Sequence, residues 1–318
     1  MTDYIARFII TLKQAISTSE DSLQELKINP TLGYINSIKI TPFIDQSKLL
    51  SKLYIEAIYS SDDIYHLCNG WGDNLNPQDG IYVIQPVNGC LMYLVPPWDI
   101  TEILIMPLLN YISALTLQAH VYWDMRENLQ KYISDFTWIL PDGTEAPPVP
   151  NQYPRLISVR SPELLGRPIN ASDWQLIQDK YNGNNQELPL WRVILAYAHR
   201  EQENSIRNTV VQCATALDVG IQSQLPNTIN FDMRVLNGYF KNKGIRTPDL
   251  RITDQALFNT LSQLWYTRHS IIHKGEAMIY DRNPQSGGQP IRPLQAQDTT
   301  EYLKAVPKGI EYVENNPP

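Results

Sequence analysis

The chain contains little cysteine. Three cysteines occur among 318 residues, at Cys68, Cys90 and Cys213, and none forms a CxxC pair. An odd number of distant cysteines argues against a disulfide framework and against a structural zinc site with the usual ligand spacing. We therefore expect a reducing compartment, and the predicted location is cytoplasmic.

Long uncharged apolar runs are missing as well, although 43% of the residues are hydrophobic. No segment reaches the length of about 18 residues that a membrane-spanning helix needs, so no membrane contact is expected. The opening residues, MTDYIARFIITLKQAIS, contain no basic leader region, no continuous apolar region and no small-residue cleavage site. A signal peptide is therefore not expected.

Motifs that bind cofactors are also lacking. The chain has neither a P-loop nor a dinucleotide-binding glycine pattern, and it has no G-x-S-x-G motif. His66 and Cys68 have no partners at metal-ligand spacing, and His120 lies in an apolar helical pattern, so a structural role is the preferred interpretation of all three. The prediction is that the protein uses no cofactor and no metal ion.

The net charge of −7 is unevenly distributed along the chain. Residues 1–185 hold 12 Lys and Arg against 20 Asp and Glu, a net charge of −8. Residues 186–318 hold 14 Lys and Arg against 13 Asp and Glu, a net charge of +1. The C-terminal half is therefore electrostatically the more favourable half for binding a polyanion such as RNA.

The N-terminal half mixes helical and strand patterns. Apolar spacing over Tyr4–Ile16 predicts an opening helix, and residues 99–136 predict a second helical region. Strand-like runs lie at residues 37–44, 80–87 and 90–98, the last two joined by the turn dipeptide Asn88-Gly89. The proline-rich residues 140–154 predict a loop or linker. Together these patterns predict an α+β domain over residues 1–170.

The C-terminal half predicts an all-α bundle over residues 171–318. Its expected helices cover residues 172–181, 190–201, 205–225, 254–273 and 299–316. Ser172 and Gln175 have the spacing of a capping box for the first of these helices. Thr253 or Asp254 would start the fourth helix, and Gly275 would end it.

The stretch LWYTRHSIIHKG (264–275) interrupts an apolar pattern with Arg268, His269 and His273. The predicted apolar stripe of this helix is Leu257, Leu261, Leu264, Ile271 and Ile272, and Arg268 falls within it. Burying an unpaired guanidinium is costly, so these groups need a partner, a cleft or a subunit interface. An alternative is that Arg268 pairs with a carboxylate between helices while the histidines stabilise the helix C-terminus. Spacing alone leaves both open.

The sequence RHSIIHKG at the end of a long helix, preceded by SIRNTVVQCATALDVGIQ, resembles the HEPN family (higher eukaryotes and prokaryotes nucleotide-binding domains). It most resembles the Apea-like branch of prokaryotic defence and toxin proteins. The family pattern maps onto Arg268, His269 and His273, followed by Lys274. The resemblance covers residues 171–318 and departs from the family at residues 278–298, an insertion before the last helix. Arg192 and His199 have a similar spacing but lie on the wrong helix.

The resemblance implies a metal-independent endoribonuclease that acts as a homodimer, with both motifs facing one cleft. His273 would move the proton of the RNA 2′-hydroxyl, and Arg268 would hold the phosphate. His269 would orient the site or contact RNA. Lys274 would bind RNA. The products would carry a 2′,3′-cyclic phosphate and a 5′-hydroxyl. Residues 1–170 would regulate this defence or toxin effector through a bound protein or ligand.

A basic stretch at residues 234–251 provides further candidates for RNA binding. Lys241, Lys243 and Arg246 follow the aromatic residues Tyr239 and Phe240 there, and basic side chains combined with aromatic ones can follow phosphates and stack bases. A solvated loop anchored by its aromatic residues is the interpretation that we prefer. At the level of function, the alternative to an enzyme is a non-catalytic HEPN module that binds RNA or a partner, or oligomerises within a larger defence assembly.

Overall fold

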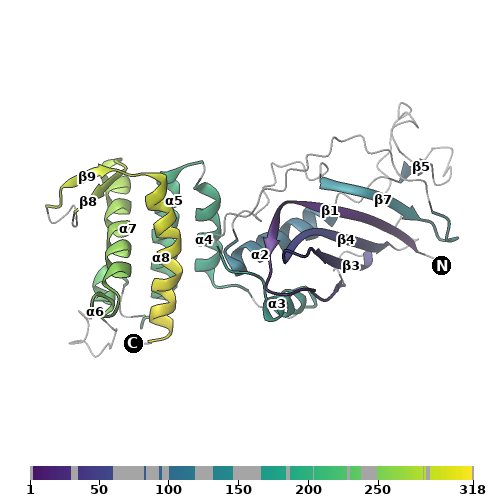
Figure 1. The fold of residues 1–318 in the computed structure, drawn as a ribbon, viewed down its shortest axis with the longest axis horizontal. Helices are drawn as coiled ribbons and strands as arrows, with labels where there is room; N and C mark the ends of the chain where they lie inside the picture. The colour runs from purple at the N-terminus through teal and green to yellow at the C-terminus, as the bar shows by residue number, and fades with distance from the viewer. Residues whose placement is uncertain are drawn as a thin grey trace. The chain divides into compact units, whose positions relative to one another are not determined.

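The protein consists of two compact units, Met1–Glu187 and Leu188–Pro318, each described here by itself. The computed structural model describes residues 3–29, 35–59, 82–83, 93–94, 100–118, 132–145, 166–183, 187–202, 204–227, 230–237, 249–281, 283 and 287–316. The first unit is rich in strands and the second is mostly helical (Figure 1). This confirms a sheet-rich N-terminal region and a helical C-terminal region.

A five-stranded antiparallel sheet forms the first unit, in the order β2-β3-β4-β1-β7. The strands are β1 (Tyr4–Ser17), β2 (Leu26–Ile28), β3 (Ile35–Ile44), β4 (Leu49–Tyr59) and β7 (Ile133–Ile139). Over much of the sheet alternate side chains are buried, as in Phe8 and Ile10 of β1 and Ile38 and Ile40 of β3, which is expected when one face packs on a core. A separate antiparallel pair consists of β5 (Tyr82–Val83) and β6 (Tyr93–Leu94).

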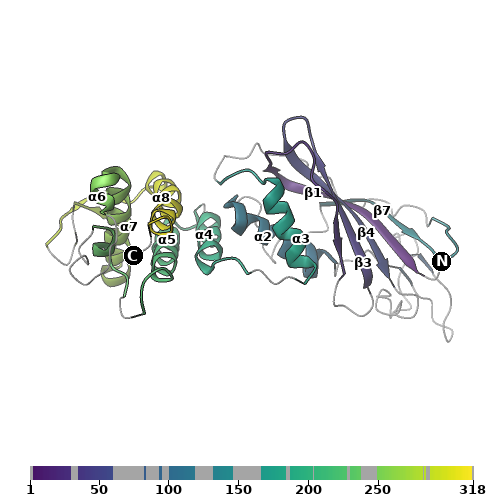
Figure 2. The ribbon, with the colours of Figure 1, turned by 90° about the horizontal axis from the view of Figure 1, so that it is seen from below.

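Two helices lie side by side at one side of this sheet (Figure 2). They are α2 (Met106–Thr116), which follows the π-helical turn η3 (Thr101–Ile105), and α3 (Ala171–Tyr181). The indole nitrogen of Trp174 on α3 donates a hydrogen bond of 2.6 Å to the carbonyl of Gln24. Because α3 packs on β2 and α2, the chain divides after Glu187, whereas the sequence placed the boundary after residue 170.

The helix predicted for Tyr4–Ile16 is wrong, because these residues form β1. Phe8 and Ile10 are buried while Arg7 is exposed, which is the period of two expected for a half-buried strand. The apolar residues are dense enough to fit either period, and pairing with β4 and β7 decides for a strand.

Other N-terminal predictions have mixed outcomes. The helix predicted over 99–136 is confirmed as far as Thr116, but residues 133–139 form β7, which pairs with β1. The strand predicted at 37–44 is confirmed within β3. The turn at Asn88-Gly89 and most of the proline-rich stretch lie outside the described residues, although β5 and β6 do pair.

The second unit contains long helices that run alongside one another (Figure 1). They are α4 (Leu190–Glu201), α5 (Ile206–Gln222), α7 (Gln255–Lys274) and α8 (Ala296–Glu314), with the short α6 (Leu250–Thr253) and the 3₁₀ turn η6 (Met233–Leu236). Figure 2 looks along the long helices and shows α5 and α8 between α4 and α7. The helices predicted from the sequence are therefore confirmed within a few residues at their ends.

The prediction that this unit is all-α is wrong in one place. Residues 278–298 hold a two-stranded antiparallel sheet of β8 (Met278–Tyr280) and β9 (Pro290–Pro293). Ile279, Tyr280 and Leu294 are buried there. β8 packs against α7, and pairing of the two strands satisfies backbone groups of both.

Two glycines allow the helices of this unit to approach closely. A Cβ atom on Gly220 of α5 would lie 2.5 Å from Cδ1 of Ile310 on α8. A Cβ atom on Gly309 of α8 would lie 2.6 Å from Cδ1 of Leu261 on α7. Glycine therefore lets α8 lie against both α5 and α7, which fixes where α7 sits in the bundle.

The same local device starts α3 and α8. Residues 167–173 read RPINASD and residues 292–298 read RPLQAQD. In each, the Asp side chain accepts a hydrogen bond from the backbone N–H of the N-cap residue. At α3 the side chain of Asn170 also accepts from the N–H of Asp173, which completes a capping box, so the predicted Ser172–Gln175 box is wrong. Arg167 and Arg292 each donate two hydrogen bonds to the aspartate of their own motif.

We expect the substitution Asp298→Asn to destabilise the helical unit by about 2 kcal/mol, because it removes a helix cap and charged hydrogen bonds. The matched variant Asp173→Asn should act on the first unit. Urea unfolding gives the loss, and hydrogen exchange at the first turns of α8 and α3 locates it. Equal protection in wild type and variant would contradict the assignment.

We expect acid to remove the stabilisation that the Asp298 carboxylate gives to the wild-type protein, because protonation weakens its bonds to Arg292 and to the backbone of Gln295. Arg292 holds the pKa of Asp298 below its ordinary value of 3.8. A carboxyl group whose pKa is lower in the folded protein than in the unfolded chain stabilises the fold at pH values above its unfolded-state pKa. This stabilisation is lost as the pH falls through the pKa of the folded protein.

Candidate functional site

Helix α7 begins and ends as its sequence predicts. The side chain of Asp254 accepts a hydrogen bond of 2.9 Å from the backbone N–H of Leu257, and Gly275 ends the helix in the left-handed conformation with φ of 69°. The buried residues of the helix are Leu261, Ser262, Leu264, Thr267 and Ser270. These positions place α7 against α5, α8 and β8.

The predicted apolar stripe of α7 is right for Leu261 and Leu264 only. Ile272 is 47% exposed, and Ile271 is half-buried. In the last two turns the covered side is instead polar. Thr267 Oγ1 lies 3.4 Å from the hydroxyl of Tyr302 on α8, and Ser270 Oγ donates to the carbonyl of Glu276 at 3.0 Å. Hydroxyls with partners inside the unit explain why this side is the buried one.

The remaining side of α7 brings together the residues that the sequence singled out. Trp265, Arg268, His269, Ile272 and His273 occupy positions i, i+3, i+4, i+7 and i+8, which is one continuous face of a helix. We call these five residues the α7 site face. The first three are half-buried, and the last two are exposed. The protein thus presents a guanidinium and two imidazoles on one accessible surface.

Other predicted RNA contacts are placed differently. The ammonium group of Lys274 lies 5.1 Å from the ring centroid of Tyr280 on β8. Lys241, Lys243 and Arg246 lie outside the described residues.

The two imidazoles of the α7 site face are in contact. The ring centroids of His269 and His273 are 4.2 Å apart, with 38° between the ring planes. Burial lowers the pKa of His269 below its ordinary value of 6.5, and the charges of His273, Arg268 and Lys274 lower it further. Burial and the neighbouring positive charges therefore favour the neutral form of His269.

Arg268 is half-buried without a direct partner. Its Nε is shielded from solvent, and no residue in the described part of the chain forms a hydrogen bond or an ion pair with its guanidinium. The Cζ atom lies 5.0 Å from the ring centroid of Trp265. Asp218 on α5 is coupled electrostatically to Arg268. Burial raises the pKa of Asp218, and the positive charge of Arg268 partly offsets that rise. The alternative of a direct Arg–carboxylate pair is not what the structure shows.

Sequence reasoning missed Trp265 and Asp218 as neighbours of Arg268. Trp265 could have been found, since it precedes Arg268 by three residues and an aromatic ring at that spacing can contact a guanidinium. Asp218 lies on another helix, and no local pattern indicates that it faces Arg268. Arg192 and His199, on α4, take no part in the α7 site face.

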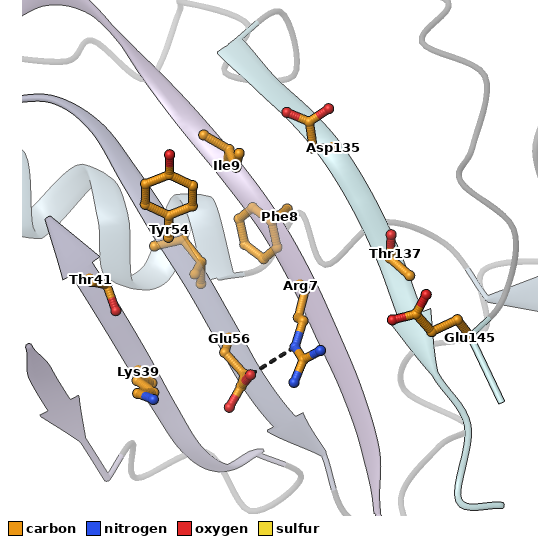
Figure 3. A pocket seen from close by; sticks show the side chains of 11 residues that line it. Arg7, Phe8, Ile9, Lys39, Thr41, Tyr54, Glu56, Asp135, Thr137 and Glu145 are labelled. Carbon is orange, nitrogen blue, oxygen red and sulfur yellow. Dashed lines mark hydrogen bonds and ion pairs between the residues drawn. The ribbon is translucent and has the colours of Figure 1, made fainter. Parts of the chain in front are cut away.

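The first unit also carries a groove, of about 320 Å³, on the polar face of its sheet (Figure 3). Tyr54 and Ile9 lie at its centre, with Asp135 and Glu145 on the β7 side. Asp135 reaches this face through a bulge: its φ is 52°, and the register between β1 and β7 shifts beside it. The bulge lets Ile133 and Phe136 both remain buried.

The cations of this groove are neutralised within the sheet. Arg7 Nε lies 2.8 Å from Glu56, and Lys39 Nζ lies 3.0 Å from Glu25. A phosphate would therefore compete with carboxylates already in place. The groove is a poor match for RNA, which leaves the α7 site face as the candidate active site.

We expect the NMR titration midpoint of His269 to lie below 6.5, because burial and neighbouring cations disfavour its charged form. Replacing His273 with Gln removes one of those charges and should raise the midpoint. The matched variant Arg200→Gln removes a positive charge from α4 and should leave it unchanged. If the titration midpoint of His269 is the same in wild type and in His273→Gln, the two rings are not electrostatically coupled.

Comparison with models of protein families, with curated proteins and with solved structures finds no match to this chain. In the described part of the chain no helix has the length and apolar character needed to cross a membrane. In the same residues no three His, Cys, Asp or Glu side chains gather as metal ligands.

Proposed function

We propose that the helical unit is a metal-independent endoribonuclease of the HEPN type, which works as a homodimer and serves as a defence or toxin effector. The observation that carries the proposal is the α7 site face. It combines an arginine whose donors have no acceptor in the described chain with two contacting imidazoles, one of which has a lowered pKa. Arg268, His269 and His273 are also the residues that match the family pattern.

The chemistry follows from groups that RNA itself supplies. The 2′-hydroxyl oxygen attacks the adjacent phosphorus while His273 takes the hydroxyl proton. The bond from phosphorus to the 5′-oxygen breaks, and that oxygen receives a proton. Arg268 donates hydrogen bonds to the phosphate oxygens and stabilises their developing charge. The products are a 2′,3′-cyclic phosphate and a 5′-hydroxyl.

A dimer gives this reaction its second imidazole. Displacement at phosphorus is in line, so the base and the acid act from opposite sides of the phosphate. His269 and His273 of one chain are in contact on the same side of α7 and do not fit that arrangement. In a dimer with two α7 site faces around one cleft, a histidine of the second copy supplies the proton to the 5′-oxygen. Ile272, exposed at the centre of the face, provides apolar contact between the copies.

The first unit is assigned a regulatory role in this proposal. It holds 12 Lys and Arg against 21 Asp and Glu, a net charge of −9, whereas the helical unit holds 14 against 12, a net charge of +2. Negative charge repels RNA, and the paired cations of the groove offer it no site. A regulatory ligand or protein would bind this unit.

Wild type in excess EDTA should cleave RNA, and His273→Ala should lose at least about 100-fold in rate, because a positioned acid or base contributes that much. Total RNA and a tRNA pool serve as substrates, and mapping of the new ends identifies cyclic phosphates. Arg268→Gln should also lose activity. Equal cleavage by wild type and His273→Ala would assign the activity to another site, and RNA retained without cleavage would favour the binding-only module.

Replacing Ile272 with Glu should weaken the dimer and reduce cleavage together, because two carboxylates would face each other in the cleft. Ile291→Glu is the matched control, since Ile291 is 60% exposed on β9 and lies off the α7 site face. Sedimentation over a range of concentrations measures association. A variant that stays dimeric with full activity would place the interface elsewhere.

A further inference from the structure

The guanidinium of Arg268 is held without using its hydrogen-bond donors. Its Nε is buried and has no acceptor in the described chain, and no direct ion pair fixes the side chain there. A buried donor without an acceptor is unfavourable. Something other than a hydrogen bond must therefore set the direction of this side chain.

Trp265 provides that contact. It lies one turn before Arg268 on the same helix, and its ring centroid is 5.0 Å from the Cζ of Arg268. The negative face of an indole attracts a cation, and the attraction is strongest for tryptophan among the aromatic residues. Because the ring contacts the guanidinium through its π electrons, this contact occupies none of the N–H groups.

The indole is itself fixed by residues from outside α7. The ring of Phe231 meets Trp265 edge-on, with centroids 5.2 Å apart and 80° between the planes. Phe231 is 7% exposed, and its backbone N–H donates a hydrogen bond of 2.7 Å to Oε1 of Gln222 on α5. Asp218, one turn earlier on α5, is the carboxylate coupled electrostatically to Arg268. The position of the arginine is thus tied to α5 through an aromatic pair.

We propose that Trp265 is a positioning residue that holds Arg268 through its ring face and so keeps the guanidinium donors directed at an incoming RNA phosphate. The inference rests on the proposed function, in which Arg268 is the phosphate clamp. It adds that an aromatic ring, in place of a carboxylate, orients the clamp. A carboxylate would occupy the donors that the phosphate needs, whereas the indole leaves them free.

The test uses the full-length protein and a 2′-O-methyl oligoribonucleotide, which carries phosphates but lacks the attacking hydroxyl. Trp265→Leu removes the ring, and Trp265→Phe keeps a weaker one. Trp191→Phe is the matched control, because Arg192 lies 4.6 Å from the ring centroid of Trp191 on α4, away from the α7 site face. The NMR signal of the Arg268 Nε–H group, assigned with Arg268→Lys, reports the side chain directly.

We expect the Arg268 signal to move on loss of the indole and the oligonucleotide affinity to fall about tenfold in Trp265→Leu. Trp265→Phe should retain most of the affinity, and Trp191→Phe should change neither quantity. The proposal is overturned if Trp265→Leu leaves both the signal and the affinity as in wild type. It is also overturned if Trp265→Phe loses as much as Trp265→Leu.

These readouts separate this inference from the proposed ribonuclease. If wild type binds the oligonucleotide through Trp265 and Arg268 but never cleaves RNA, the positioning role stands and the enzymatic proposal fails. If wild type cleaves RNA and Trp265→Leu does so with unchanged kcat and KM, the ribonuclease stands and the positioning role is overturned. A fall in kcat with the end chemistry unchanged supports both.

Discussion

A positive charge held half inside a helical bundle, without a direct counter-ion, is the constraint on which the rest of the helical unit depends. Arg268 cannot lie deeper, because an unpaired guanidinium is too costly to desolvate, and it is not free in solvent, because Trp265 and Asp218 lie beside it. The ring of Trp265, on the same helix, contacts the guanidinium, and the carboxylate of Asp218 on α5 acts on it electrostatically without a direct ion pair. Such an environment is stable only if it is rigid.

Close packing supplies the rigidity. Gly220 and Gly309 let α8 approach α5 and α7, and the hydroxyls of Thr267 and Ser270 find partners on the covered side of α7. Covering that side turns the opposite one toward solvent. The hydrogen bonds of Thr267 and Ser270 therefore help to set which side of the last two turns of α7 is buried.

Much of the helical unit could be predicted from sequence, because its signals are local. Asp254 and Gly275 mark the ends of α7, and the spacing of Arg268 and His273 places them on the same helix. Which side chains of α7 are buried could not be predicted. The apolar pattern predicts that Ile272 is buried and Ser270 exposed, but Ser270 is buried because its hydroxyl pairs with Glu276 and with Tyr280 on β8, and Ile272 is exposed. The coupling of Asp218 to Arg268 is likewise tertiary. In the first unit, Tyr4–Ile16 fits a helical and a strand period equally, and strand pairing decided.

The paired motifs RPINASD and RPLQAQD have a consequence beyond the two helices that they start. One motif precedes a helix packed on a sheet and the other a helix in a bundle, so neither environment is needed for it to work. Every bond in the device lies within seven residues. The seven-residue sequence could therefore be placed before a helix in a designed protein to fix where that helix begins.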